Sequence, residues 1–409
     1  MTTRTDPLGF LADEVETLRR DHLYRALKVM SSQQGPEIEL DGRHVISLSS
    51  NDYLGLTHHP RMKDAALRAV RDYGAGSGAV RTIAGTMTIH EALEAELAAF
   101  KGTEAVLTFQ SGFTANTGVL PAITDERDLI VSDQLNHASI IDGMRLSKAP
   151  RTLYPHADVA GLRDLLSDAR EKGRQDPGHI GEPHRSILVV TDGVFSMDGD
   201  IAPLPGIVEA AEEHGAAVFV DDAHASGVLG RNGRGSVDHF GLHGRVAIQV
   251  GTLSKAVGAL GGYVAGSAAL REWLTQRSRP FLFSTSHPPA VVEACREAIR
   301  IMDDEPGLIE RLWANTRRFK GELTRLGFDT GASETPITPV IVGTSEAAIR
   351  FSERLLSEGV FATSVVYPTV ALDRARLRTI VTAALSDEQL DRALEAFDRV
   401  GHELGLIGA

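Results

Sequence analysis

The sequence contains very little cysteine and no long apolar run. Cys295 is the single cysteine among 409 residues, so no internal disulfide can form and a reducing compartment is expected. No stretch of about 18 or more apolar residues occurs, which excludes a membrane-spanning helix. The N-terminal residues also lack the apolar run of a secretory signal peptide and instead predict a polar amphipathic helix. These absences predict a cytoplasmic protein without a membrane partner.

Positive charge is also scarce. Lysine and arginine total 42 residues against 55 aspartates and glutamates, which gives a formal net charge of −13. Because nucleic acids and anionic membranes are bound by basic faces, neither is expected as a partner. A phosphorylated small molecule needs only a local cluster of donors and is not excluded. The length exceeds what one hydrophobic core normally serves, so either two domains or one large domain with a smaller appendage is expected.

Short apolar runs alternate with helical stretches between about Ser49 and Ala265. The runs are continuous, which is typical of parallel strands covered by helices on both faces. They are AVLTF (105–109), LIV (129–131), SILVV (186–190), AAVFV (216–220), VAIQV (246–250) and GYVAG (262–266). This alternation predicts an α/β fold with a mainly parallel sheet.

After about Arg300 the pattern changes to that of a smaller α+β domain. A helix is expected over 346–359, extended segments over 361–370 and 376–384, and a last helix from near Ser386. We therefore expect three parts, namely an N-terminal helical arm (1–48), a large α/β domain (49–297) and a small C-terminal α+β domain (298–409).

Polar or reactive groups follow five of the predicted strands. The segments in question are SGFTAN, LNHAS, TDGVFSMDGD, DDAHASG and GTLSK. In open parallel sheets, ligands bind at the carboxyl ends of the strands. A functional site is therefore predicted at this edge of the sheet.

Lys255 lies in QVGTLSKAVGALGGY (249–263), among residues that are mostly small, apolar or glycine. An ordinary lysine would lay its stem on apolar surface and extend its ammonium group to solvent. Alternatively, its amine could be bonded to an aldehyde cofactor and need no ion-pair partner. That chemistry requires an acidic group beside a pyridine nitrogen, a phosphate cradle and a group lying flat against the ring.

The sequence offers candidates for each requirement. Asp221 ends a predicted strand and could face a protonated pyridine nitrogen, although alone it would more often be a helix cap or salt-bridge partner. His224 could hydrogen-bond the phenolic oxygen of the ring. His137 could stack on the ring, although a histidine in a loop is more often only a satisfied polar residue.

A phosphate cradle is predicted where a helix begins. Gly112 and Phe113 open a predicted helix, and free backbone amides at such a position bind phosphate. Thr252 could add a hydroxyl group. By contrast, GAGSGA (74–79) resembles a dinucleotide fingerprint but follows a helical segment, so we discount it. No residues have the spacing of metal ligands, and no metal site is predicted.

Taken together, these motifs resemble the α-oxoamine synthases, which are pyridoxal-phosphate (PLP) enzymes of fold type I that join an amino acid to an acyl-CoA. The matching motifs run in order along the chain as NDYLG (51–55), GSGAVRTIAGT (76–86), SGFTAN (111–116), NHASIIDG (136–143), TDGVFSMDGD (191–200), VDDAHASGVLG (220–230), GTLSKA (251–256), FSTSHPP (283–289) and ARLRTIVTAA (375–384). The resemblance implies a fold type I PLP-dependent transferase, with a mainly parallel seven-stranded sheet in the large domain. It also implies a homodimer with shared active sites.

The resemblance assigns roles to residues around the cofactor. Lys255 is similar to the lysine bonded to PLP, and Asp221 to the partner of the pyridine nitrogen. His224 and Ser196 would contact the phenolic oxygen. His137 would stack on the ring and assist at the carbonyl oxygen of the acyl-CoA.

Further residues would hold the phosphate and the substrates. Gly112, Phe113 and Thr252 would bind the phosphate, and Ser284 and Thr285 would contact the phosphate of the neighbouring subunit.

On the substrate side, Arg378 would bind the amino-acid carboxylate, a bidentate task suited to guanidinium. Asn51 would lie beside the substrate, and Arg25 and Thr369 match substrate-side positions. Leu385 departs from the pattern, because related enzymes usually have histidine there.

The choice between members of the family depends on short segments. DGRHVI, AVRTIAGT, NHASIIDGMRL and QRSRPFLFS are most similar to glycine C-acetyltransferase, which makes 2-amino-3-ketobutyrate from glycine and acetyl-CoA and belongs to threonine degradation. SSNDYLGLTHHP, SGFTAN, DGDIAP, STSHPP and YPT are more similar to 8-amino-7-oxononanoate synthase of biotin synthesis, which uses L-alanine and pimeloyl-CoA and releases CO₂. The expected activity is the former; the alternatives are the latter, or one enzyme that performs both reactions.

Other activities are less favoured. Serine palmitoyltransferase is a weaker match within the family. A fold type I aminotransferase, which needs no acyl-CoA site, or a non-catalytic relative would be an alternative of a different class. The ordered motifs disfavour an aminotransferase, and the presence of Lys255, Asp221 and His137 disfavours a non-catalytic protein.

Overall fold

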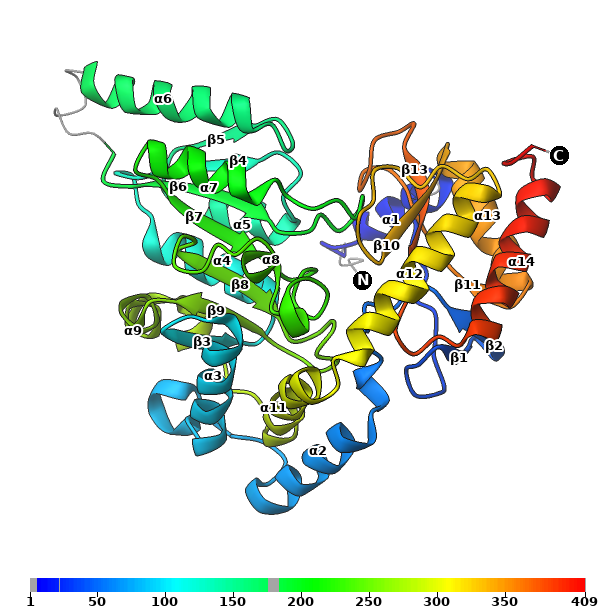
Figure 1. Cartoon of the computed structure of the whole chain (residues 1–409), viewed down its shortest axis with the longest axis horizontal. Coiled ribbons are helices and arrows are strands. Elements are labelled where there is room, and N and C mark those ends of the chain that lie inside the picture. Colours follow the sequence, from blue (N-terminus) through cyan, green and yellow to red (C-terminus); the bar gives the residue numbers. More distant parts are fainter. Residues whose placement is uncertain (1–5, 22, 176–183, 409) are drawn as a thin grey trace, which may run out of the picture.

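The chain folds into a large and a small lobe, described by a computed structural model for residues 6–21, 23–175 and 184–408 (Figure 1). The large lobe is built on a seven-stranded sheet of order β3-β9-β8-β7-β6-β4-β5. Its strands are β3 (Ala105–Phe109), β4 (Leu129–Asp133), β5 (Arg151–Tyr154), β6 (Ile187–Asp192), β7 (Ala217–Asp221), β8 (Ile248–Thr252) and β9 (Gly262–Gly266).

The sheet is mainly parallel, as the sequence predicts. Strands β8, β7, β6, β4 and β5 run parallel, and β9 is antiparallel to both of its neighbours. The edge strand β5 was not predicted from the sequence, because its RTLY segment is short and only partly buried and so lacks a continuous apolar run. The six predicted strands match observed ones, with ends displaced by at most a few residues.

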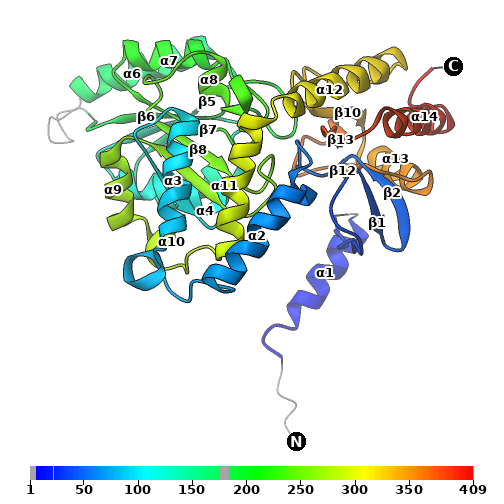
Figure 2. The same ribbon diagram turned by 60° about the horizontal axis from the view of Figure 1, so that its bottom comes forward.

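Helices cover both faces of this sheet (Figure 2). On one face Leu188 and Val190 of β6 pack in a core with α4, α5, α9 and α10. On the other face Ile187 and Val189 pack with α6, α7 and α8, and α2, α3 and α11 cover the β3–β9 side. This two-sided burial is the reason that the strands read as continuous apolar runs. The helices are α2 (Pro60–Tyr73), α3 (Thr88–Lys101), α4 (Gly112–Ile123), α5 (Ala138–Leu146), α6 (Val159–Gln175), α7 (Leu204–Glu213), α8 (Ser236–His239), α9 (Ala268–Arg277), α10 (Arg279–Leu282) and α11 (Pro289–Asp304).

The small lobe contains an antiparallel sheet of order β10-β13-β12. Phe319, Phe351 and Phe397 meet in its core, with ring centroids 5.4–5.8 Å apart for the two pairs that involve Phe397. Its elements are α12 (Gly307–Arg325), β10 (Ile337–Gly343), α13 (Ser345–Ser357), β12 (Thr363–Val365), β13 (Ala375–Ile380) and α14 (Asp387–Glu403). Short turns of helix occur at η1 (Leu56–His58), η2 (Arg81–Gly85) and η3 (Arg231–Gly233).

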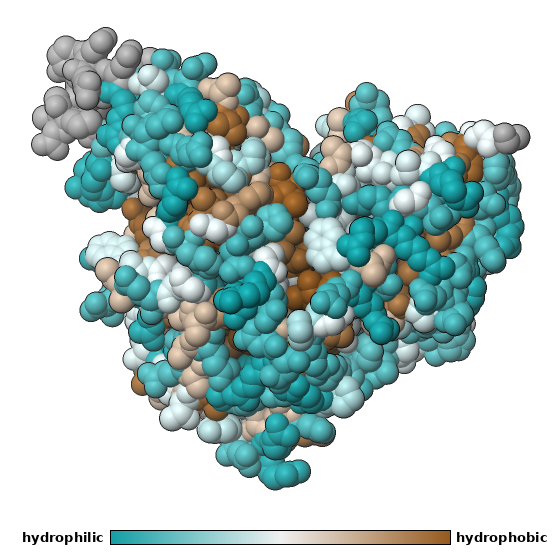
Figure 3. All heavy atoms as spheres, in the orientation of Figure 1, coloured by the Kyte–Doolittle hydropathy of each residue, from teal (hydrophilic) through white to brown (hydrophobic). Residues whose placement is uncertain are grey.

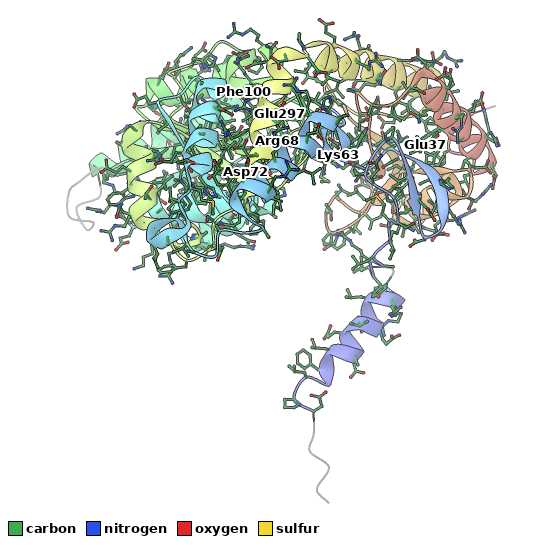
Figure 4. The ribbon with its side chains drawn as sticks, turned by 90° about the horizontal axis from the view of Figure 1, so that it is seen from below. Glu37, Lys63, Arg68, Asp72, Phe100 and Glu297 are labelled. Atoms are coloured by element: carbon green, nitrogen blue, oxygen red, sulfur yellow. The ribbon has the colours of Figure 1, made fainter. Side chains whose placement is uncertain are left out.

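The range expected to form an N-terminal helical arm contains a β-hairpin as well as a helix. β1 (Glu37–Leu40) and β2 (Arg43–Ser47) pair with each other, and β2 pairs in parallel with β11 (Val360–Phe361) of the small lobe. α1 (Phe10–Arg20) has no buried residue and projects away from both lobes (Figures 2 and 4). Nowhere in the described ranges is a helix both long and apolar enough to cross a bilayer.

An open groove of about 610 Å³ lies between the lobes. It is lined by side chains that include Ile201, Val228, Ile309 and Trp313, and Figure 3 shows hydrophobic residues where the two lobes meet. None of the predicted site residues lines this groove.

Candidate active site

The ends of three adjacent strands form the floor of the site. Asp192 ends β6, Asp221 ends β7 and Thr252 ends β8. Asp192 and Asp221 are register partners, and Asp221 is the partner of Val250 on β8. The sheet therefore brings together residues that are 60 positions apart in sequence, as expected at the carboxyl edge of parallel strands.

Asp221 is buried and accepts hydrogen bonds on both oxygens. Its Oδ1 accepts from the backbone N–H of Ala223 at 2.9 Å, and its Oδ2 accepts from Nδ2 of Asn116 at 2.6 Å. Sequence analysis missed Asn116 because the motif that contains it, SGFTAN, was interpreted only as a phosphate site. These donors fix the carboxylate at the end of the strand.

A second carboxyl group lies beside it. Asp192 is buried, and its Oδ2 accepts the backbone N–H of His137 at 2.8 Å. Burial, followed by the charge of Asp221, raises the pKa of Asp192 well above its usual value. Asp192 therefore takes up a proton more readily than an exposed carboxyl group does.

The amine of Lys255 interacts electrostatically with both of these carboxyl groups. Burial lowers the pKa of Lys255 to about 8, while Asp221 and then Asp192 oppose the shift and Arg378 adds to it. A neutral amine is consequently accessible near neutral pH, and a neutral amine is what attack on an aldehyde requires.

His224 and Tyr53 form a buried pair. The phenol oxygen of Tyr53 lies 2.7 Å from Nδ1 of His224. Burial, then the charges of Lys255 and Arg378, lower the pKa of His224 well below its usual value, so that the ring is neutral. Burial raises the pKa of Tyr53. Tyr53 was not predicted, although it lies in the NDYLG motif.

The guanidinium group of Arg378 on β13 contacts two other predicted residues, Ser196 and Asn51. Its Nε donates to the backbone carbonyl of Ser196 at 2.5 Å, and both Nη atoms donate to Oδ1 of Asn51 at 3.3 and 3.4 Å. The contact with Ser196 thus involves its carbonyl oxygen. Burial lowers the pKa of Arg378, yet an arginine remains charged at all working pH values.

The N-terminus of α4 faces the end of β8. Ser111 caps this helix, and a Cβ atom placed on Gly112 would lie 3.3 Å from Cβ of Thr252. Thr252 Oγ1 donates to the carbonyl of Gly261 at 2.9 Å and hydrogen-bonds Oγ of Ser254 at 2.7 Å. The backbone amides at the start of α4 are therefore the groups here that suit an anion, with the Thr252 side chain close beside them.

His137 caps the N-terminus of α5, where its Nδ1 accepts the backbone N–H of Ser139 at 3.2 Å. Its side chain is exposed. Partial desolvation lowers the pKa of His137, Asp221 opposes this shift and Lys255 adds to it.

The remaining predicted residues lie outside the buried cluster. Phe113 and Thr285 are exposed and Ser284 is half-buried, and the Thr285 carbonyl accepts from Nε2 of Gln110 at 2.8 Å. The structure also brings Arg25 and Thr369 together at the surface, with Nη2 of the arginine 3.0 Å from the threonine hydroxyl.

Leu385, in place of the usual histidine, lies in the core of the small lobe. Its side chain is buried, and its carbonyl accepts from Nδ2 of Asn315 at 3.0 Å. The residue therefore serves packing.

These residues fit PLP. A buried carboxylate, an amine of lowered pKa and a helix start that approaches Thr252 closely match the pyridine nitrogen, the aldehyde and the phosphate. In the described part of the chain, Oδ1 of Asn116 is buried without a hydrogen-bond partner. Among the same residues, no three histidine, cysteine or acidic side chains are grouped to hold a metal ion.

Comparisons with known proteins agree with this assignment. The family described as "Aminotransferase class I and II" matches residues 43–397. 8-Amino-7-oxononanoate synthase of Symbiobacterium thermophilum is 61% identical over 97% of this chain and 99% of its own. 8-Amino-7-oxononanoate synthase 1 of Bacillus subtilis is 54% identical over 98% of this chain and 100% of its own.

Solved structures of another enzyme are also similar to this chain over nearly its whole length. Serine palmitoyltransferase of Sphingomonas wittichii superposes with a TM-score of 0.90 at 32% identity, covering 99% of this chain and 100% of its own. Serine palmitoyltransferase of S. paucimobilis, solved with bound PLP and myriocin, gives a TM-score of 0.89 at 31% identity, covering 98% and 100%. The chain therefore belongs to the α-oxoamine synthases, the PLP-dependent acyltransferases of fold type I within the class I and II aminotransferase family.

Proposed function

We propose that the enzyme is an 8-amino-7-oxononanoate synthase, which condenses L-alanine with pimeloyl-CoA and releases coenzyme A and CO₂. The observation that supports this proposal is that relatives of that name are 53–61% identical in sequence across 97–98% of the chain. The expectation of a glycine C-acetyltransferase in threonine degradation therefore gives way to the alternative. The short motifs suggested otherwise because each covers few residues, and some, such as DGRHVI in the β1–β2 hairpin, lie away from the strand ends that form the site.

The residues around Lys255 fit a proton transfer at the amino-acid substrate. Bound PLP supplies an electron sink for the negative charge that develops at the α-carbon. Asp221 would hold the pyridine nitrogen through its negative charge, and Nζ of Lys255 would accept the α-proton. The lowered pKa of about 8 for Lys255 suits a base that works near neutral pH.

Arg378 is proposed to bind the substrate carboxylate. In the structure its two Nη atoms share one weak acceptor, Oδ1 of Asn51, at 3.3 and 3.4 Å. A carboxylate would replace this acceptor with two charge-assisted hydrogen bonds, which are shorter and stronger. The Nε–H donated to Ser196 holds the guanidinium in the plane needed for that contact.

We further propose a homodimer, located in the cytoplasm, in which Ser284 and Thr285 complete the partner's phosphate site. α1 exposes Phe10, Leu11 and Leu18 with none of its residues buried, and an uncovered apolar face of this kind is typical of an interface. Sedimentation equilibrium of the holoenzyme would give twice the chain mass of 43.9 kDa, and a monomer would refute this part.

A coenzyme A release assay tests the activity. Glycine, L-alanine and L-serine are each combined with acetyl-, pimeloyl- and palmitoyl-CoA, and CO₂ release is measured in parallel. L-Alanine with pimeloyl-CoA is expected to give the highest kcat/KM, with one CO₂ released for each coenzyme A. Higher kcat/KM for glycine with acetyl-CoA would refute the proposal, and Lys255→Ala provides the baseline without catalysis.

A further inference from the structure

A chain of hydrogen bonds connects Asp221 to His137 through two buried residues that have no assigned role. Nδ2 of Asn116 donates to Oδ2 of Asp221 at 2.6 Å and to Oγ of Ser139 at 2.8 Å. Oγ of Ser139 in turn lies 2.7 Å from Nδ1 of His137. Asn116 and Ser139 are 0% and 1% exposed, so water does not reach these two side chains.

The donors and acceptors fix the direction of this chain from Asp221 as far as Ser139. A carboxylate oxygen of Asp221 can only accept, which orients the amide of Asn116 with its NH₂ group toward Asp221. Both hydrogens of that NH₂ group are then used, and the second is donated to the hydroxyl oxygen of Ser139. The hydroxyl hydrogen of Ser139 remains available for Nδ1 of His137, although the hydroxyl oxygen could also accept a second hydrogen bond.

A second donor reaches the same nitrogen. The backbone N–H of Ser139 points at Nδ1 of His137 with a donor–acceptor distance of 3.2 Å. A nitrogen that accepts hydrogen bonds carries a lone pair, so the hydrogen of the neutral imidazole lies on Nε2. The lowered pKa of His137 agrees with a neutral ring.

We propose that Asn116 and Ser139 are positioning residues that hold His137 as the neutral Nε2–H tautomer, and that this N–H is a fixed donor to the thioester carbonyl oxygen of the acyl-CoA. The inference rests on the proposed function for the identity of that oxygen. A donor aimed where negative charge develops stabilises the transition state without having to reorganise. The opposite tautomer would present a lone pair to the oxygen and repel it.

The tautomer can be measured without any substrate. Long-range ¹H–¹⁵N spectra of the full-length holoenzyme, labelled with ¹⁵N-histidine, report which ring nitrogen carries hydrogen. The His137 signals are identified by their loss in His137→Gln. We expect one tautomer, protonated at Nε2, on both sides of neutral pH. A hydrogen on Nδ1, or an imidazolium at pH 7, would overturn the inference even if the enzyme used L-alanine and pimeloyl-CoA.

Ser139→Ala tests the role of the relay. Removing the hydroxyl is expected to produce a mixture of the two tautomers and to lower kcat by about two- to tenfold, the factor that one net hydrogen bond supports. KM for L-alanine is expected to change less than kcat. Ser139→Thr, which restores a hydroxyl, is expected to recover the single tautomer.

Ser147→Ala is the matched control. Ser147 lies at the other end of α5, where its buried hydroxyl bonds Oγ1 of Thr124 at 2.7 Å. Its loss removes a comparable bond from the same helix, and we expect the His137 spectrum and kcat to be unchanged. An unchanged His137 spectrum in Ser139→Ala, or an equal change in Ser147→Ala, would refute the relay. If Ser139→Ala does not fold, the wild-type spectrum still decides the tautomer.

Discussion

His156 offers a quantitative test of the ion pairs that hold the loop after β6, which carries Ser196 and Asp200. Its Nδ1 lies 3.2 Å from Oδ1 of Asp133 and its Nε2 lies 2.9 Å from Oδ2 of Asp200. Both ring nitrogens thus face carboxylates, which favours the imidazolium. The hydrogen bond with Asp133, and then that with Asp200, raise the pKa of His156 to about 10.

The shift sets the size and the sign of the effect on stability. A rise from 6.5 to about 10 corresponds to about 5 kcal/mol at ~1.4 kcal/mol per pKa unit. The side chain is 23% exposed, so solvent screening reduces this to about 3 kcal/mol. Because the folded-state pKa is raised, the stabilisation is fully present below pH 6.5 and is lost as the pH rises through about 10.

The perturbation is His156→Gln, measured by guanidinium unfolding of the holoenzyme at pH 7 and pH 10.5. At pH 7 we expect the free energy of unfolding of the variant to be about 3 kcal/mol lower than that of the wild type. At pH 10.5 this difference should largely disappear. His243→Gln is the control, because His243 pairs with a single carboxylate, Asp238, and is 40% exposed; about 0.5 kcal/mol is expected there. A gap for His156→Gln that is equal at the two pH values would refute the reasoning.

The same substitution has a functional consequence. Asp200 belongs to the loop that carries Ser196, and the Ser196 carbonyl accepts from Nε of Arg378. Loosening this loop releases one restraint on the guanidinium. KM for the amino acid is therefore expected to rise in His156→Gln, while the affinity for PLP is retained.

Three further outcomes are expected. The rate at which the apoenzyme bonds PLP should rise with pH around an apparent pKa of about 8, the value to which burial lowers Lys255; a midpoint near 10.5 would contradict the assigned environment. Arg378→Ala should raise KM for the amino acid about 100-fold or more, because two charge-assisted hydrogen bonds of about 1.5–3 kcal/mol each are lost, with much less effect on PLP affinity; equal losses in titrations of both ligands would contradict its role. Gly112→Ala should weaken PLP binding, because its Cβ would lie 3.3 Å from Thr252, whereas Gly76→Ala, whose Cβ would meet nothing within 4 Å, should leave the Kd for PLP unchanged.

Local patterns were sufficient to predict the large sheet and the groups at its strand ends. Continuous apolar runs predicted six of its strands, since burial on both faces removes polar residues from a strand. Reactive residues after these runs predicted that Lys255, Asp221 and His224 share a site. The patterns did not predict β5, whose RTLY segment is short and partly exposed, or the hairpin of β1 and β2.

The contacts between distant segments were decided by the tertiary structure alone. Tyr53 meets His224, and Asn116 connects Asp221 to Ser139. Each of these residues lies in a motif that sequence analysis had singled out, but a motif does not state which atoms will touch. Hydrogen-bond partners depend on distances between elements, and these distances are fixed only when the sheet and its helices pack.

By itself, then, the order of residues determined the fold class and the cofactor and singled out the lysine proposed to bond it, because each of these leaves a local chemical pattern. The packed molecule decided that the pKa of Asp192 is raised, which partners hold the guanidinium group of Arg378, and on which nitrogen the proposed His137 tautomer carries its hydrogen. Those properties depend on burial and on neighbours brought from other strands, and no local stretch of sequence contains them.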